Sequence, residues 1–330
     1  MSKFVRNVDN VKLDGIVSCL PQKKISNNSL SQIFSEKDIK NISKSTGVES
    51  RFLTTSLEKT SDLCLKAANH LIASLGWDRK NIDGVIFITQ TPDKLIPATS
   101  NRLQYLLGLS NNAFAFDINL GCSAYPYGLW IASSLMQSGS KRILILVGDT
   151  ISKIINNKDR STAFLFGDAG SATALSIKDN NPINFILGSD GEGSENIKAE
   201  YNQHLEMNGA KVFEFSLSRI PSLVKNIDFY NGGAHDIYFF HQANKFMLNY
   251  LKKKCKIPEG AFPVNIENYG NTSSASIPLL MTDCINKENL RNSSNVALLG
   301  FGVGFSWSAA SLSLSSDLFL DKIFLDETIK

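Results

Sequence analysis

The fold is decided by residues 117–130, which read DINLGCSAYPYGLW. The apolar run at 113–118 predicts a buried strand, and Gly121 then marks a turn. Cys122 opens a segment that is apolar on nearly every side as far as Met136. Such a segment predicts a helix in the interior of the protein, because a surface helix would carry a polar face.

Cys122 is the first candidate for a functional residue. A thiol in the first turn of a helix faces unpaired backbone N–H groups and the positive end of the helix dipole, and both stabilise the thiolate. We therefore expect Cys122 to be a nucleophile. The alternative, on this stretch alone, is a small buried hydrophobic residue, which is what most free cysteines are.

Length and composition predict an ordinary globular protein of two domains. The chain has 330 residues, of which 43% are hydrophobic and 20% charged, and it is too long for one small core. The net charge is +3, and the one basic cluster, Lys252 to Lys254, is typical of a solvated helix end. We therefore expect no nucleic-acid partner.

The cysteines and the hydropathy pattern exclude several other classes. Five cysteines, odd in number and without a CxxC pair, argue against a zinc site or a disulfide framework and fit a reducing compartment. The N-terminus has no apolar signal core, and no run approaches the ~20 apolar residues of a membrane helix. We therefore expect a cytoplasmic protein that holds no metal and contacts no membrane.

Strands and helices alternate along the chain, which predicts an α/β fold built from parallel βαβ units. The first half is predicted to contain strands at 11–20, 84–89, 113–118 and 142–147, and helices between Ser35 and Gly47 and at 60–75, 101–107 and 122–138. The second half is predicted to contain strands at 236–240, 262–266 and 296–301, and helices at 244–255 and 273–285. Because the order repeats after roughly 150 residues, we expect two related domains, residues 1–178 and 179–330, around one ligand-binding crevice.

Two polar residues of the second half take positions like that of Cys122. His241 directly follows the strand at 236–240, and Asn271 opens a helix of small residues. A nucleophilic cysteine needs a proton acceptor and donors for developing negative charge, and these two residue types supply both. The alternative for each is a helix cap. The glycine turn at 300–305, GFGVGF, can also aim a backbone N–H at an oxyanion.

With these residues in view, the sequence resembles the 3-oxoacyl-[acyl-carrier-protein] synthase III family of the thiolase-like superfamily. Six motifs carry the resemblance, in the family's order and spacing: NLGCSA around Cys122, FGDAGSATAL from Phe166, MNGAKVFEF from Met207, HQAN from His241, NYGNTSSASIP from Asn268 and GFGVGFSW from Gly300. The resemblance covers nearly the whole chain. The resemblance implies the five-layered αβαβα thiolase fold, with two duplicated βαβ-type halves, and usually a homodimer whose loop around Ile96 and Pro97 reaches towards the partner's site.

The resemblance also implies roles for individual residues. Cys122, His241 and Asn271 match the catalytic triad, and Gly304 matches the glycine whose N–H forms the oxyanion hole together with that of Cys122. For substrate binding, Arg160 matches a nucleotide-contacting arginine, and Asn244 ends the HQAN motif. An acyl tunnel is expected to be shaped by four apolar side chains: Phe87, Leu95, Ile96 and Phe305.

The activity implied is a decarboxylative Claisen condensation of an acyl thioester with malonyl-acyl carrier protein, through an S-acyl cysteine. No cofactor is implied beyond the thioesters of coenzyme A or acyl carrier protein. Asn41 and Ser45 stand where the family usually has the Trp and Arg that help to hold coenzyme A, and Phe246 replaces a basic residue that helps to dock the carrier protein. An acyl donor on another carrier, and a specialised pathway, therefore stay open.

Two other functions also remain open on the sequence alone. One is an acyltransferase that passes the cysteine-bound acyl group to an oxygen, nitrogen or sulfur acceptor without forming a carbon–carbon bond. The other is a noncatalytic partner subunit, for which Cys122 would be unreactive.

Overall fold

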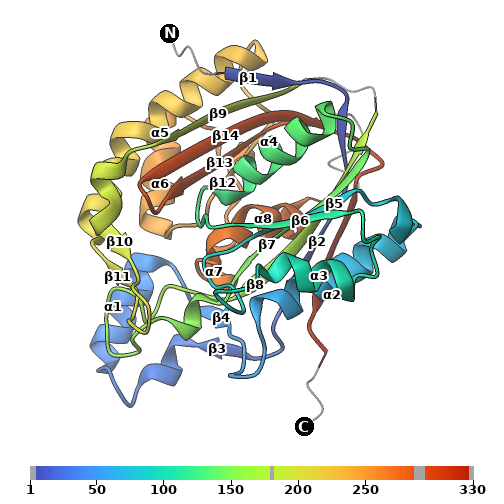
Figure 1. The fold of residues 1–330 in the computed structure, drawn as a ribbon. Helices are drawn as coiled ribbons and strands as arrows, with labels where there is room; N and C mark the ends of the chain where they lie inside the picture. The colour runs from blue at the N-terminus through green and yellow to red at the C-terminus, as the bar shows by residue number, and fades with distance from the viewer. Residues whose placement is uncertain (1–4, 179–181, 286–293, 327–330) are drawn as a thin grey trace.

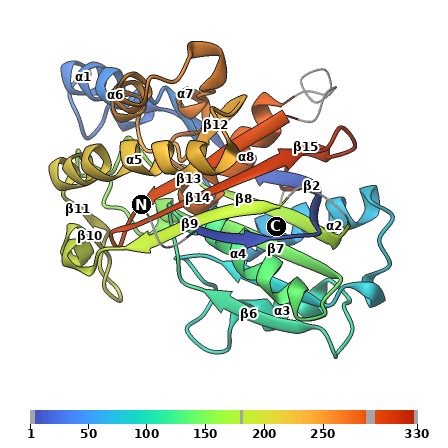
Figure 2. The same ribbon diagram turned by 90° about the horizontal axis from the view of Figure 1, so that it is seen from above.

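The computed structural model describes residues 5–178, 182–285 and 294–326. Two β-sheets and three layers of helices are stacked in the order α, β, α, β, α (Figure 1). Figure 2 shows the same layers from above, with α5 on one outer side and α3 on the other. The predicted five-layered thiolase fold is confirmed.

The first sheet has six strands. In spatial order these are β15 (Phe319–Phe324), β2 (Val11–Leu20), β8 (Ala169–Ile177), β7 (Arg142–Asp149), β5 (Gly84–Ile88) and β6 (Phe114–Ile118). β7, β5 and β6 are parallel, as predicted, whereas β8 runs antiparallel to both of its neighbours. Helices α2 (Thr60–Ser74) and α3 (Thr99–Leu106) cover the outer face, which is why every residue of β5 is buried.

The second sheet has five strands. In spatial order these are β1 (Val5–Val8), β9 (Ile183–Ser189), β14 (Ser306–Leu314), β13 (Ser294–Gly302) and β12 (Ile237–Phe240). Only the pair β12 and β13 is parallel. Helices α5 (Gly209–Asn231) and α6 (Lys245–Cys255) cover its outer face.

The middle layer consists of α4 (Ala124–Gln137) and α8 (Ser276–Cys284), which lie between the two sheets. The predicted interior helix after Cys122 is confirmed, since Leu129 of α4 and Leu280 of α8 are both 0% exposed. Burying one such leucine stabilises the fold by about 1.5–3 kcal/mol. These two helices fix the distance between the sheets, and both begin beside the pocket described below.

The two halves share one architecture but exchange their terminal strands. The order β9, β14, β13, β12 in the second sheet repeats β2, β8, β7, β5 in the first. β1, from the N-terminus, pairs with β9, and β15, from the C-terminus, pairs with β2. The division into residues 1–178 and 179–330 stays a proposal, with each half carrying one strand of the other's sheet.

One predicted strand is wrong. Residues 262–265 form no regular element, and 266–269, Ile266–Tyr269, form the short helix α7. Pro263 explains the error, because proline has no N–H to give to a strand ladder. As a result β12 is the edge strand on this side of the sheet.

Several smaller elements complete the described fold. They are α1 (Glu36–Thr46), the strand pair β3 (Lys24–Ser26) and β4 (Ser50–Phe52), and the pair β10 (Ile197–Lys198) and β11 (Glu206–Met207). β10 and β11 contribute residues to the pocket. The predicted caps of α1 are confirmed: Ser35 accepts a hydrogen bond from the N–H of Asp38, and Gly47 has φ +72°. The N-cap of α2 is Lys59, whose backbone N–H donates to the Asp62 carboxylate at 2.9 Å.

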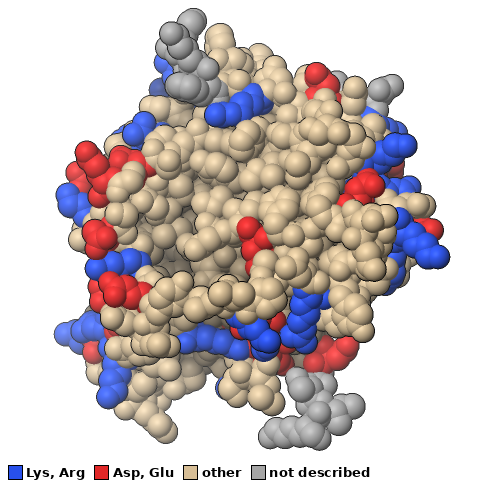
Figure 3. Space-filling model, viewed as in Figure 1, with Lys and Arg blue, Asp and Glu red and all other residues tan. Residues whose placement is uncertain are grey.

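The surface carries charges of both signs. On the face seen in Figure 3, Lys, Arg, Asp and Glu lie mostly around the border, and the middle is largely uncharged. Across the three described ranges, no helix combines the length and the hydropathy needed to span a bilayer.

Candidate active site

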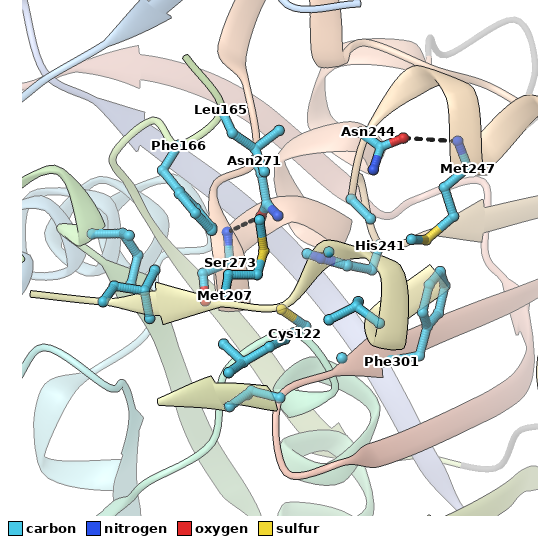
Figure 4. Close-up of a pocket in the computed structure, with 18 of the residues that line it drawn as sticks. Cys122, Leu165, Phe166, Met207, His241, Asn244, Met247, Asn271, Ser273 and Phe301 are labelled. Atoms are coloured by element: carbon cyan, nitrogen blue, oxygen red, sulfur yellow. Dashed lines mark hydrogen bonds between the residues drawn. The ribbon is translucent and has the colours of Figure 1, made fainter. Parts of the chain in front are cut away.

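One pocket lies where strands of both sheets end. Cys122 follows β6, His241 follows β12, and Asn271 lies just before α8; the three side chains line the same cavity (Figure 4). The remaining wall is mostly apolar, with side chains from several loops and helices: Leu165, Phe166, Met207, Val212, Met247 and Phe301. The structure therefore brings together the three residues that the sequence singled out from two halves of the chain.

Glycine allows the two halves to meet at Cys122. A Cβ atom on Gly302 would lie 2.8 Å from Cβ and 2.9 Å from Sγ of Cys122, closer than atoms can approach. Gly302 also has φ +153°, which side chains rarely allow. Beside it, the Ser123 hydroxyl lies 2.7 Å from that of Ser306, and the Ser308 hydroxyl donates to the Ser123 carbonyl at 2.8 Å. The end of β13 is thereby fixed against the start of α4.

The resting thiol is protonated. Burial raises the pKa of Cys122 to about 12, although the backbone N–H groups of Val303 and of Cys122 itself, and the Ser273 hydroxyl, act in the opposite direction. The expectation that the helix terminus would hold a thiolate is therefore wrong, because the cost of desolvating the anion is larger. Cys122 still keeps some exposed surface, through which a substrate can reach it.

The backbone donor at the thiol comes from Val303. Its N–H is the strongest of the groups that favour the Cys122 thiolate, and Val303 lines the pocket together with Gly302. Gly304, which the motif suggested for this role, is exposed and does not line the pocket. The role of Gly304 stays a prediction. An oxyanion hole depends on where an N–H points, and the direction follows from the φ of the neighbouring glycines, not from residue type.

His241 is a neutral imidazole. It is 1% exposed, and burial lowers its pKa to about 3, against a smaller opposing effect of the Ser273 carbonyl. Its Nδ1 lies 2.7 Å from the hydroxyl of Ser276 in α8. The alternative of a helix cap is excluded, because Asn244 is the N-cap of α6 and accepts a hydrogen bond from the N–H of Met247 at 2.8 Å.

Asn271 is held by backbone bonds on both sides. Its N–H donates to the carbonyl of Leu165 at 2.8 Å, and its carbonyl accepts from the N–H of Gly167 at 3.1 Å. Its side-chain Oδ1 accepts from the N–H of Ser273 at 2.9 Å. Because Oδ1 is used locally, the carboxamide N–H groups are the part of Asn271 that can donate into the pocket.

Comparison with known proteins shows the family. Residues 116–191 match the family described as 3-oxoacyl-[acyl-carrier-protein] synthase III, and residues 231–314 match its C-terminal domain. The beta-ketoacyl-[acyl-carrier-protein] synthase III of Clostridium tetani is 36% identical over 88% of this chain and 94% of its own. A putative 3-oxoacyl-[acyl-carrier-protein] synthase 3 of Campylobacter jejuni is 34% identical over 96% of this chain and 97% of its own. The chain belongs to the 3-oxoacyl-[acyl-carrier-protein] synthase III family.

The fold agrees at the level of the whole chain. The crystal structure of a 3-oxoacyl-(acyl-carrier protein) synthase from Burkholderia xenovorans superimposes with a TM-score of 0.94 at 38% identity, covering 97% of this chain and 99% of that one. The resemblance read from six motifs is therefore confirmed for the family and for the fold.

In this synthase III chain, the residues proposed for substrate binding are more scattered than the triad. Asn244 lines the pocket, but Arg160 does not, and its guanidinium pairs with Asp38 at 2.7 Å on the surface. None of the four expected tunnel residues lines this cavity. Phe87 lies in the core beneath α2, and the ring of Phe305 stacks on that of Phe215 with the ring centroids 4.3 Å apart. Leu95 and Ile96 are 70% and 85% exposed. The apolar wall instead comes from loops, helices and strands, with side chains that the sequence had not suggested for the tunnel.

Proposed function

We propose that this protein condenses an acyl thioester with malonyl-acyl carrier protein, releasing carbon dioxide and giving a 3-oxoacyl thioester. The proposal rests on one observation: a cysteine, a neutral histidine and an asparagine from two halves of a synthase III chain line a single buried pocket. The names of the relatives support it. Cys122, His241 and Asn271 are the proposed catalytic residues.

The first step transfers the acyl group to Cys122. Sγ attacks the thioester carbonyl, and the N–H groups of Cys122 and Val303 hold the oxyanion of the tetrahedral intermediate. The carbon–sulfur bond of the donor then breaks. The thiol proton ends on the departing thiol, so the step needs no net proton.

The second step forms the carbon–carbon bond. The malonyl carboxylate leaves as carbon dioxide, and the resulting enolate oxygen accepts hydrogen bonds from His241 and Asn271. For this His241 must carry its proton on Nε2, which the Ser276 hydroxyl favours if it donates to Nδ1. The enolate carbon attacks the acyl carbonyl, Cys122 departs as thiolate and takes up a proton from solvent. One such donor is typically worth about 3–4 kcal/mol in the transition state.

The acyl carrier of the first step is proposed only as a thioester of coenzyme A or of a carrier protein. Arg160 and Lys245 each already have an acidic partner, Asp38 and Glu267, so neither is a free cation for a nucleotide or a carrier protein. A homodimer is part of the proposal as well. The exposure of Leu95 and Ile96 in one loop supports it, because two adjacent apolar side chains are covered at little cost by a second copy.

Two measurements test the function. Intact-protein mass spectrometry with acyl-coenzyme A and acyl-carrier-protein donors should show one acyl group added to the parent chain and none to Cys122→Ala. Release of carbon dioxide from malonyl-acyl carrier protein by the acylated protein then separates condensation from simple acyl transfer. An acyl adduct that persists in Cys122→Ala would overturn the assignment of the nucleophile, and acylation without carbon dioxide release would favour the transferase.

A further inference from the structure

A buried carboxylate lies behind the pocket. Asp149 ends β7, is 0% exposed, and accepts hydrogen bonds from the described residues on both of its oxygens. Oδ1 accepts from the N–H of Gln90 at 2.7 Å and from the hydroxyls of Thr89 and Thr91 at 3.0 and 3.3 Å. Oδ2 accepts from the N–H and the hydroxyl of Ser274 at 3.2 and 2.7 Å. Burial raises the pKa of Asp149, and the hydrogen bonds from Ser274 and Gln90 act in the opposite direction by stabilising the carboxylate.

The two oxygens join the two halves of the protein. Residues 89–91 follow β5 in the first half, whereas Ser274 lies between Asn271 and α8 in the second half. One side chain therefore links both halves at the wall of the pocket, where Gln90 and Ser273 are both lining residues.

The segment held by Asp149, residues 271–276, contacts two of the pocket's polar side chains. The N–H of Ser273 donates to Oδ1 of Asn271 at 2.9 Å, and the Ser276 hydroxyl lies 2.7 Å from Nδ1 of His241. Ser273 has φ +49°, a left-handed conformation that is unfavourable for a residue with a side chain. Such a conformation persists only when its surroundings hold it, and the two bonds from Ser274 to Asp149 do so directly.

We propose that Asp149 is a positioning residue for the condensation step: by holding Ser274, it sets the 271–276 segment so that Asn271 and His241 both face the enolate. This inference rests on the proposed function. Asp149 touches no reacting atom, and it acts through Ser274.

The electrostatics of Cys122 agree with a role in the second step. Asp149 contributes, after burial, to raising the pKa of Cys122, so its charge disfavours the thiolate. A group that disfavours the thiolate does not assist acylation. Its benefit then lies in the residues that it holds, and two of the side chains positioned by this segment, Asn271 and His241, serve the condensation step.

The Asp149→Asn variant is tested by measuring the acylation of Cys122 and the release of carbon dioxide separately. The variant keeps the shape of the side chain but replaces an accepting oxygen by an NH₂ group that faces donors. We expect the rate of Cys122 acylation to stay within about threefold of the parent, and release of carbon dioxide by the acylated protein to fall about 100-fold, the usual effect of displacing a catalytic group by 1 Å. Equal losses in both steps, or no loss in either, would overturn the proposal.

A matched control comes from the opposite end of β7. Asp83 also holds a backbone segment, accepting from the N–H groups of Lys141 and Arg142 at 2.6 and 3.0 Å, but far from the pocket along the strand. Asp83→Asn should leave the ratio of the two rates unchanged. If Asp149→Asn fails to fold, Ser274→Ala removes a single bond and should lower carbon dioxide release about tenfold. Where both variants fold, the double variant should be no slower than Asp149→Asn, because both act through one contact.

Hydrogen exchange keeps this inference distinct from the proposed function. Peptides covering residues 271–281 should exchange at least about tenfold faster in Asp149→Asn than in the parent, and at the parent's rate in Asp83→Asn. Unchanged exchange would overturn the role of Asp149 even in an active enzyme. If exchange is faster in Asp149→Asn but the parent chain releases no carbon dioxide, Asp149 remains the residue that holds this segment and the proposed function is defeated instead.

Discussion

The buried imidazole of His241 makes the stability of the protein depend on pH in a specific way. Burial lowers the pKa of His241 from 6.5 to about 3 in the folded state. Between these values the unfolded chain binds a proton that the folded chain does not bind, so acid favours unfolding. The stabilisation is fully present above pH 6.5 and is lost progressively as the pH falls towards 3.

The magnitude follows from the width of this window. Each pH unit inside it costs about 1.4 kcal/mol of folding free energy. Lowering the pH from about 7 to about 4.5 crosses roughly two such units, so His241 alone should cost the folded state about 2–3 kcal/mol. Since the side chain is 1% exposed, solvent screening does not reduce this figure appreciably.

Urea unfolding at the two pH values, in the parent and in His241→Gln, measures the effect. Glutamine has no proton to gain, so the variant should lose about 2–3 kcal/mol less than the parent on acidification. His204→Gln, at an exposed histidine outside the pocket, controls for the loss of a histidine as such. An equal loss in the parent and in His241→Gln would refute the neutral, buried imidazole, and with it the proposed donor to the enolate.

Three further predictions concern the pocket. Asn271→Ala should acylate at Cys122 at the parent's rate but release carbon dioxide about 10²–10³-fold more slowly, as measured by single-turnover assays; a matching loss of acylation would contradict the assignment of Asn271 to the second step. Val303→Pro, which removes the N–H, should slow acylation about 10²–10³-fold, whereas the acylation rate of Val303→Ala, which keeps the N–H, should stay within a few-fold of the parent's. Time courses of intact protein mass measure both rates, and equal rates in the two variants would contradict the role of this N–H. Because burial raises the pKa of Cys122 to about 12, its alkylation by iodoacetamide should accelerate about tenfold per unit between pH 7 and 10, and a plateau near neutral pH would exclude the protonated resting thiol.

Cys122, His241 and Asn271 could be proposed from the sequence because each stands next to the end of a predicted strand or the start of a predicted helix. His241 follows a buried apolar strand and Asn271 precedes a small-residue helix. Cys122 also follows a strand, but β6 is an edge strand whose residues are only half-buried, so the prediction that 113–118 is buried is wrong. In an α/β fold such strand ends converge. The buried strands β5 and β7 and the interior helix α4 could be predicted from the sequence, since their apolar runs have no polar face.

The sequence could not show which way a side chain or a backbone N–H points within a buried strand or turn. Phe87 was expected in the tunnel, but β5 is apolar throughout, and nothing in such a run says which side chains face a cavity and which face α2. Val303 was missed because a backbone N–H has no side-chain signature. Asp149 was missed because the predicted strand stopped at Val147, two residues short of the carboxylate that ends β7.

The pocket works with neutral groups. None of the described residues that line it is Asp, Glu, Lys or Arg, and its three central side chains are a protonated thiol, a neutral imidazole and a carboxamide. In such a wall the malonyl carboxylate finds no ion partner, whereas the enolate that replaces it finds two donors. Donors in a water-poor cavity act more strongly than in water, and they need no reorganisation when the charge arrives. The same burial that makes Cys122 a reluctant thiolate therefore favours loss of carbon dioxide, which is why the site needs Val303 for the first step and a rigidly held 271–276 segment for the second.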